Sequence, residues 1–237
     1  MTDTDPLRAA MIEAAERQLA SSSDHEVATR AVCEAVGVSQ PVLYRLFGDK
    51  RGLLDAVADH GYERYAALKA AQEQTGDPVA DLHAGWDGHM AFAQANPALY
   101  QLMFIPRPWS HSTARDRVMD LLVAALTRCA AAGALKVEPR TAARLILSAN
   151  VGTALDHVAR PALFDDPALS HRMRDAVFSY VLTTTPAQHD AQPVRDAALR
   201  LRAQLQLAET DALEPAETAL LLRWLDRITQ AEPRDGS

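Results

Sequence analysis

Residues 32–47 read Val-Cys-Glu-Ala-Val-Gly-Val-Ser-Gln-Pro-Val-Leu-Tyr-Arg-Leu-Phe. We expect a helix that ends at Gly37, because a chain leaving a helix often needs a left-handed residue, and glycine adopts that conformation without a Cβ penalty. Ser39 is placed to cap a second helix, and Pro41 is tolerated in its first turn because the amide it lacks would be unpaired there. Two short helices joined by a turn with glycine form a helix-turn-helix, whose second helix enters the major groove of DNA.

The same segment resembles the TetR family of transcriptional regulators. The residues at that family's spacing are Gly37-Val38-Ser39, Leu43-Tyr44, Phe47, Lys50 and Leu53-Leu54. The resemblance covers about residues 7–60. It implies an all-α protein in which an N-terminal three-helix helix-turn-helix domain is joined by a long helix to a C-terminal helical domain. That second domain would bind a ligand and form a homodimer.

The second helix of the motif separates apolar from polar side chains. Leu43, Leu46 and Phe47 would face the core of the domain. Gln40 and Arg45 would point outward, and these side-chain types recognise adenine and guanine edges with two hydrogen bonds each. This pattern predicts that the helix reads the bases of a DNA operator.

Further candidates surround that helix face. Pro41 or Val42 can touch a thymine methyl group. Thr29 begins the preceding helix and offers a hydroxyl and a positive helix end to a phosphate. The resemblance implies phosphate contacts for Tyr44 and Lys50. The complete set of candidate DNA-binding residues is Thr29, Ser39, Gln40, Pro41, Val42, Tyr44, Arg45 and Lys50.

The charge of the chain limits how DNA could be attracted. The net charge is −7, and residues 1–61 carry six Lys and Arg against ten acidic residues. Residues 39–51 alone hold a net charge of +2, so the attraction would be local and completed by a dimer. Two alternatives remain open. In the first, the helix at residues 39–47 is a solvated helix within an ordinary bundle. In the second, Arg45 forms an ion pair with Glu34 or Asp49 instead of contacting DNA.

Composition predicts the fold class and the compartment. The chain is 48% hydrophobic but only 5% aromatic, and it is rich in the helix formers Ala and Leu. No apolar run approaches the roughly 18–20 residues that span a bilayer, and the start lacks the features of a signal peptide. We therefore expect an all-α cytoplasmic protein without a membrane partner. Cys33 and Cys129 are interpreted as small buried residues of a reducing cytosol.

Polar residues followed by proline mark the starts of several predicted helices. These pairs are Asp77-Pro78, Asn96-Pro97, Glu138-Pro139, Asp166-Pro167 and Glu214-Pro215. The expected helices lie at residues 7–19, 27–36, 39–47, 50–73, 78–95, 97–104, 114–132, 139–159, 167–183, 194–208 and 215–230. The expected domains are a helix-turn-helix DNA-binding domain (1–61), a ligand-sensing and dimerisation domain (62–186) and a helical C-terminal extension (187–237). The extension would pack on the second domain or widen the dimer contact.

Large, adaptable side chains gather between residues 86 and 109. Pockets for apolar ligands are lined by aromatic side chains and Met with a few polar groups, and the resemblance implies an inducer in this part of the chain. The candidate ligand-binding residues are Trp86, His89, Met90, Tyr100, Met103, Phe104, Trp109 and Asn150. We expect a small apolar or aromatic effector and no cofactor. Plain core packing is the alternative for each residue.

The resemblance also implies a dimer interface. The helices at 139–159 and 167–183 would pair with their twofold mates as a four-helix bundle. Small residues such as Ala149, Gly152 and Ala154 suit a close approach of helices.

The sequence offers little support for an enzyme. It has no Gly-x-Ser-x-Gly motif, no phosphate-cradling glycine loop and no Cys/His ligand cluster. His83 and His89 lie six residues apart, which is not a helical metal-binding pair, so no metal site is expected. The remaining alternative to a regulator is a helical adaptor whose helix-turn-helix domain no longer binds DNA.

Overall fold

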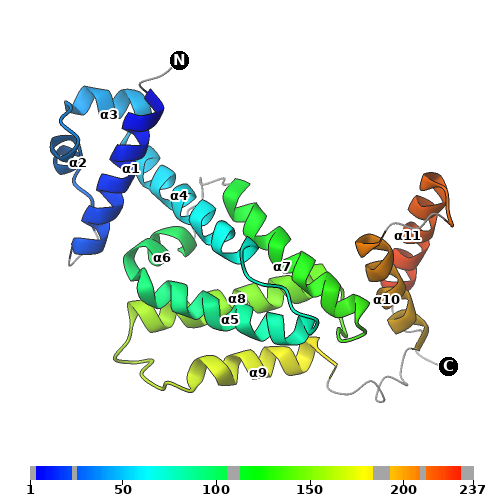
Figure 1. The fold of residues 1–237 in the computed structure, drawn as a ribbon. Coiled ribbons are helices and arrows are strands. Elements are labelled where there is room, and N and C mark those ends of the chain that lie inside the picture. The colour runs from blue at the N-terminus through cyan, green and yellow to red at the C-terminus, as the bar shows by residue number, and fades with distance from the viewer. Residues whose placement is uncertain (1–3, 23–25, 106–112, 184–192, 209–211, 231–237) are drawn as a thin grey trace. The chain divides into compact units, whose positions relative to one another are not determined.

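The computed structural model describes residues 4–22, 26–105, 113–183, 193–208 and 212–230. Eleven α-helices occur within these ranges (Figure 1). In chain order they are α1 (Thr4–Ser21), α2 (Thr29–Ala35), α3 (Gln40–Phe47), α4 (Lys50–Ala70), α5 (Pro78–Ala95), α6 (Pro97–Phe104), α7 (Thr113–Ala131), α8 (Pro139–Ala159), α9 (Leu169–Val181), α10 (Pro193–Leu207) and α11 (Pro215–Gln230). The prediction of an all-α protein is confirmed.

Several helix ends differ from the expected positions. Helix α2 begins at Thr29 rather than residue 27, because Ala28 before it has an extended backbone (φ −95°, ψ 114°). Helix α4 ends at Ala70, three residues before the expected end. Helix α9 ends at Val181 because Leu182 is extended and forms an isolated antiparallel bridge with Leu135.

Contacts divide the chain into two compact units. Unit 1 combines residues 1–72, 88–119 and 151–167, and unit 2 combines residues 73–87, 120–150 and 168–237. Helices α5, α7 and α8 therefore contribute to both units. These units do not follow the three expected domain ranges, which stay a prediction.

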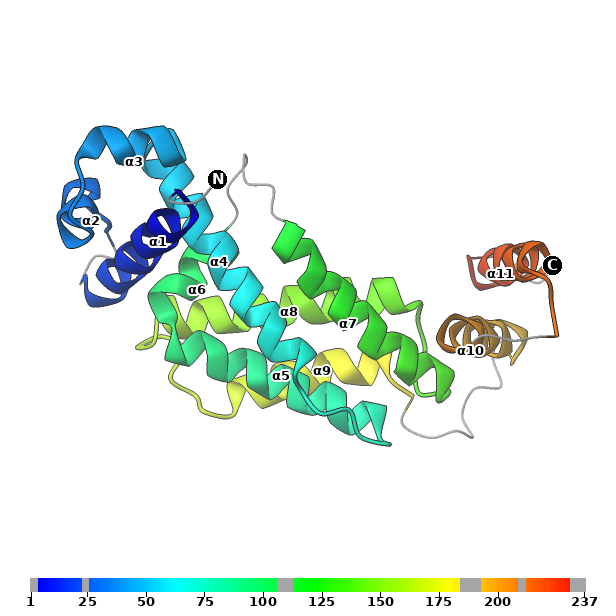
Figure 2. The same ribbon diagram turned by 45° about the horizontal axis from the view of Figure 1, so that its top comes forward.

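In the helix-turn-helix part of unit 1, helices α1 and α3 pack against the start of α4 (Figure 2) and enclose an apolar core. Its buried side chains include Met11, Ile12, Ala15, Leu19, Val32, Cys33, Leu43, Leu53 and Val57. The helical spacing of apolar residues predicted for α1 is thus the spacing that fills the core. The Gln18 Oε1 atom accepts a hydrogen bond from the Ala28 amide (3.0 Å), which attaches the segment before α2 to α1.

Helices α4 and α6 pack closely within unit 1. A Cβ atom added at Gly61 would lie 2.7 Å from the Met103 Sδ atom, so a larger residue there would force the Met103 side chain to shift. Beside it, the Tyr62 hydroxyl donates a hydrogen bond to the Met103 carbonyl. Arg64 forms an ion pair with Glu16 of α1 (2.8 Å) and donates to the Asn96 Oδ1 atom (3.4 Å) at the start of α6. Helix α4 is therefore attached to both α1 and α6.

Unit 2 also has a buried core, to which Leu126, Cys129 and Val181 contribute. Both described cysteines, Cys33 and Cys129, are buried and free, as interpreted from the sequence. Helices α10 and α11 form a hairpin in this unit. None of the described helices combines the length and the apolar character that a membrane span requires.

Candidate functional site

The turn between α2 and α3 has the predicted geometry at its glycine. Gly37 adopts a left-handed conformation (φ +72°), and the Val38 amide donates to the Cys33 carbonyl (3.0 Å). This αL ending allows the chain to leave α2 within two residues and begin α3 at Gln40. The helix-turn-helix motif expected from residues 32–47 is therefore present.

Ser39 has the predicted N-cap position of α3, but the expected side-chain cap is not formed within the described residues. Ser39 occupies the N-cap position with an extended backbone, but its side chain accepts no capping hydrogen bond from a described residue. An N-cap side chain accepts from the second or third amide of the helix. Pro41 removes the second amide, and the Val42 amide instead donates to the Ser39 carbonyl (3.0 Å). Neither amide that the Ser39 hydroxyl could cap therefore bonds to it.

Helix α3 presents one apolar and one polar face, as predicted. Leu43 is fully buried, while Leu46 and Phe47 are half-buried. The outward residues are Gln40, Pro41, Tyr44 and Arg45, all exposed, with Val42 half-buried beside them. The helix therefore offers hydrogen-bonding and aromatic side chains to solvent while its other face anchors it to the core.

The carboxylates that could compete for Arg45 have other partners. Glu34 forms an ion pair with Arg30 one turn earlier in α2 (2.8 Å). The Asp49 carboxylate accepts a hydrogen bond from the Gly52 amide (2.8 Å) and caps α4, as the sequence predicted. Arg45 forms no ion pair with any residue that the structure describes. Its guanidinium is therefore available for a ligand.

Lys50 lies at the first residue of α4, just after the α3 helix. Its Nζ atom is 3.7 Å from the Glu26 Oε2 atom, and both side chains are exposed. Exposed pairs of this kind contribute at most about 1 kcal/mol, so a phosphate can replace the carboxylate. Thr29 is the first residue of α2 and is half-buried.

The candidate effector residues of unit 1 converge on His89. This imidazole is buried, with Nδ1 2.6 Å from the Tyr65 hydroxyl and Nε2 2.5 Å from the Tyr100 hydroxyl. A neutral imidazole has one N–H donor and one acceptor nitrogen, so one tyrosine donates to the ring and the other accepts from it. The three side chains come from α4, α5 and α6 and link these helices.

Burial determines the protonation state of this cluster. It lowers the pKa of His89 to about 3, with a smaller contribution from the charge of Lys69. Burial also lowers the pKa of Lys69 to about 8, and the Lys69 Nζ atom lies 5.5 Å from the centre of the Tyr65 ring. The pKa values of Tyr65 and Tyr100 are raised, mainly by burial. At neutral pH the side chains of His89 and the two tyrosines are therefore uncharged, and the Lys69 side chain beside them is a cation.

The remaining predicted residues of unit 1 surround this cluster or lie near it in sequence. Phe104 is half-buried and stacks on Tyr100, with ring centroids 4.5 Å apart. Met90 and Met103 are buried. Sequence reasoning missed Tyr62, Tyr65 and Lys69 of α4, although their spacing of three and four residues places them on one helix face. Trp109, also a candidate, lies outside the described residues.

Two candidate effector residues belong to unit 2. Trp86 is buried, packs near Phe178, and donates from Nε1 to the Ser170 hydroxyl (3.0 Å). Asn150 is buried, and its Nδ2 atom lies 3.5 Å from the Trp86 carbonyl. The Asn150 Oδ1 atom is buried without a hydrogen-bond partner among the described residues. Such an oxygen costs about 1–3 kcal/mol unless a ligand satisfies it.

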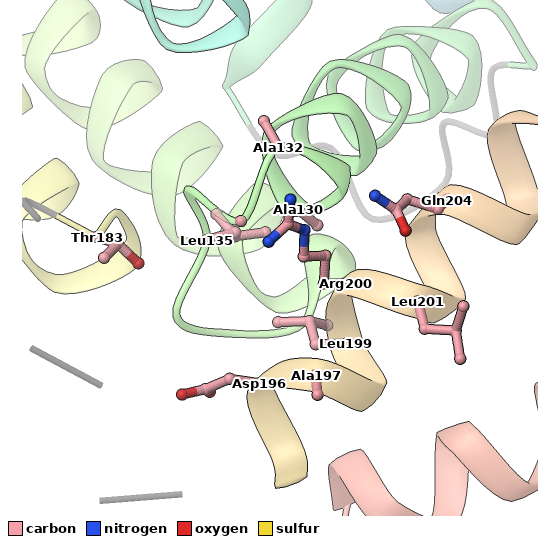
Figure 3. A pocket seen from close by; sticks show the side chains of 11 residues that line it. Ala130, Ala132, Leu135, Thr183, Asp196, Ala197, Leu199, Arg200, Leu201 and Gln204 are labelled. Carbon is pink, nitrogen blue, oxygen red and sulfur yellow. The ribbon is translucent and has the colours of Figure 1, made fainter. Parts of the chain in front are cut away.

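A cavity of about 430 Å³ lies elsewhere in unit 2, between the end of α7 and helix α10 (Figure 3). Leu135, Leu199 and Arg200 are among the side chains that line it, and none of the predicted effector residues does. Among the described residues, no group of three or more His, Cys, Asp or Glu side chains could hold a metal ion.

Exposed apolar side chains mark the outer faces of α8 and α9. Leu145 of α8 is exposed, and so are Met173 and Tyr180 of α9. Gly152 of α8 is exposed as well, and a Cβ atom added there would meet open space. These positions belong to the two helices for which the resemblance implies a dimer interface.

Two family models match the chain. Residues 11–57 match the bacterial regulatory proteins of the tetR family, and residues 82–225 match the tetracyclin repressor-like C-terminal domain. The second match extends through α10 and into α11, so it includes much of the segment expected to be an extension. No curated protein matches the chain.

Solved structures of several bacterial proteins are similar. A protein of unknown function from Rhodococcus sp. RHA1 is 24% identical, over 75% of this chain and 96% of its own, with a TM-score of 0.61. SmeT, the repressor of the SmeDEF multidrug efflux pump of Stenotrophomonas maltophilia, is 19% identical over 78% and 95%, with a TM-score of 0.58. FadR from Bacillus subtilis, solved in complex with stearoyl-CoA, is 16% identical over 72% and 97%, with a TM-score of 0.57. At these identities the likeness concerns the fold.

Proposed function

Because this chain belongs to the TetR family of transcriptional regulators, we propose that it is a ligand-responsive repressor that binds a palindromic DNA operator as a homodimer. Members of this family are DNA-binding regulators rather than enzymes. The observation that carries the proposal is the solvent face of α3, where Gln40, Tyr44 and Arg45 are exposed and Arg45 has no ion-pair partner among the described residues. Gln and Arg are the side chains that recognise adenine and guanine in the major groove.

Phosphate contacts would hold this helix in register. Tyr44 and Lys50 flank the exposed face, and the exposed pair between Lys50 and Glu26 is weak enough to exchange for a phosphate. Thr29 and Ser39 supply hydroxyl groups at the starts of α2 and α3. Few cationic contacts per copy mean that two copies are needed for tight binding. The exposed apolar faces of α8 and α9 support such a dimer.

The contacts of α4 suggest how an effector would reach the DNA-binding helix. Gly61 and Tyr62 pack α4 against Met103 of α6, and Arg64 connects α4 with α1. A ligand that displaces α6 would therefore move α4 and, with it, the helix-turn-helix core. Its coupling to operator binding would be the difference in its affinity for the two arrangements, typically 1–3 kcal/mol.

Two groups of side chains support a small apolar or aromatic effector. The unit 1 group around His89 is rich in aromatic rings and Met. In unit 2, the unsatisfied Asn150 Oδ1 atom would accept a hydrogen bond from a donor on the effector. Asn150→Leu replaces this buried acceptor with a side chain of similar branching but larger volume, so its melting temperature is measured beside its affinities. Its operator affinity should be unchanged, while the effector concentration needed for release should rise about tenfold.

Selection of bound sequences from a random DNA pool tests the regulator itself. We expect an enriched palindrome whose half-sites lie one helical turn or a multiple of it apart, because a twofold dimer presents two α3 helices. A pool without enrichment would refute operator binding and favour the adaptor hypothesis. An enriched single half-site without a palindrome would refute the dimeric mechanism.

A further inference from the structure

Helix α11 buries one face and exposes apolar side chains on another. On the buried face lie the apolar Leu225 and the polar Thr229. Leu220, Trp224 and Ile228 recur every fourth residue, so they form one stripe along the helix. These three side chains are 41%, 52% and 39% exposed. An isolated exposed leucine needs no explanation, but a continuous stripe with a tryptophan at its centre is typical of an interaction surface.

The first face of α11 is already used within the hairpin. Arg195 of α10 donates from Nε to the Thr229 carbonyl (3.0 Å), and Arg202 of α10 forms an ion pair with Asp226 (3.0 Å). Helix α11 lies beside α10 in both ribbon views (Figures 1 and 2). The stripe of Leu220, Trp224 and Ile228 is therefore additional to the face that holds the hairpin together.

We propose that this stripe binds the same stripe of a second copy of the chain, with the two α11 helices antiparallel across a twofold axis. The charges and side-chain sizes along α11 suit this occupant. In the register that places Leu220 opposite Trp224 of the second copy, Glu217 lies opposite Arg227. The same register places the small Ala216 opposite the large Ile228.

A twofold contact demands this kind of self-complementarity, because each residue must fit its counterpart in the same sequence. Glu217 and Arg227 are exposed and lie at opposite ends of the apolar stripe. Glu217 accepts a hydrogen bond from the Glu214 amide through one oxygen (2.9 Å), and a carboxylate retains acceptor capacity for a second partner. Unlike charges flanking an apolar seam set the orientation of paired helices.

A pair of helices buries less than the roughly 1,200–2,000 Å² of a stable protein–protein interface. The α11 contact should therefore strengthen self-association and not replace the α8 and α9 contact proposed above. It does not depend on operator binding, since the α3 helix takes no part in it.

Disulfide trapping in the full chain tests the register. The variant with Leu220→Cys and Trp224→Cys should form a covalent dimer on mild oxidation, because each new thiol would face its counterpart across the axis. The matched control carries Ala219→Cys and Arg223→Cys, which have the same spacing on an exposed side of α11 away from the stripe. Disulfides require Cα atoms about 4.4–6.8 Å apart, so the control should cross-link at least about tenfold more slowly. Equal rates, or no covalent dimer in either variant, would overturn the proposal.

Charge reversal provides the second readout. Glu217→Arg or Arg227→Glu alone creates two like-charge pairs per dimer and should weaken self-association roughly tenfold in sedimentation or light scattering. The double variant restores both pairs and should regain most of the affinity. A double variant as weak as the singles would overturn the pairing, and so would a loss of stability in Trp224→Glu that is independent of protein concentration, because the stripe would then pack within its own chain. Circular dichroism of each variant checks that the helices are intact.

Discussion

Acidification should destabilise the protein in part through the side chain of His89. Its imidazole is buried between the hydroxyls of Tyr65 and Tyr100, and the pKa of His89 is lowered to about 3. In the unfolded chain the pKa of histidine is about 6.5. Between these two values the unfolded state binds a proton that the folded state does not, so stability falls as the pH falls from about 6.5 towards 3.

The size of this effect follows from the two pKa values. At pH 7.5 almost no histidine is protonated in either state, and the contribution is close to zero. Each pH unit below 6.5 stabilises the unfolded chain by about 1.36 kcal/mol relative to the folded one, because only the unfolded chain binds the proton. At pH 5.0, about 1.5 units lower, the difference is about 2 kcal/mol. The charge of Lys69, on α4 beside Tyr65, acts in the same direction because it opposes a second positive charge on His89.

Urea unfolding of the native protein and of His89→Gln, followed by circular dichroism at both pH values, measures this term. Gln keeps a donor and an acceptor but does not titrate. The variant should be less stable at pH 7.5, since it packs less well between the two tyrosines. At pH 5.0 the difference in unfolding free energy between the native protein and the variant should be smaller by about 2 kcal/mol. Only the native protein has an imidazole at this position that takes up a proton on unfolding. A deficit that is the same at both pH values would refute the role assigned to His89.

Local rules were enough to predict the helix-turn-helix from the sequence. Gly37 needed a positive φ, Asp49 needed to cap α4, and Leu43 needed to be buried, and each of these requirements is met in the structure. The same rules failed for the side chain of Ser39, because Pro41 removes one of the two amides that a serine cap uses, and the other, that of Val42, donates to the Ser39 carbonyl instead. Two favourable signals at neighbouring positions therefore competed.

The effector region was harder to predict because its contacts join helices that are distant in sequence. The aromatic and Met residues of α5 and α6 indicated a common region, but the partners of His89 depend on how α4 lies against them. Periodicity assigns Tyr65 to a face of α4 without saying which helix covers that face. The three-helix network thus required tertiary structure, whereas the exposed face of α3 required only one helix and its turn.

The remaining predictions concern DNA binding and assembly. Arg45→Ala should cost about 1–3 kcal/mol of operator affinity and relax the base preference. Lys50→Ala should instead weaken binding to all DNA sequences alike and reduce the slope of log affinity against log salt concentration by about one. Glu26→Gln removes the carboxylate that pairs with Lys50 and should raise affinity a few-fold in filter binding, though not in the Lys50→Ala background. Gly152→Glu should break the dimer without harming the fold, because its Cβ atom meets open space and losing a helical glycine stabilises a helix by up to about 1 kcal/mol. The matched control is Gly85→Glu in α5, where a Cβ atom also meets open space. Gly85→Glu should therefore melt no lower than the native protein, whereas Gly152→Glu should lose the stability that the dimer contact adds and, with the dimer, tight binding to a full palindrome. If Gly152→Glu remained a dimer, or bound the palindrome tightly as a monomer, the twofold mechanism would have to be abandoned.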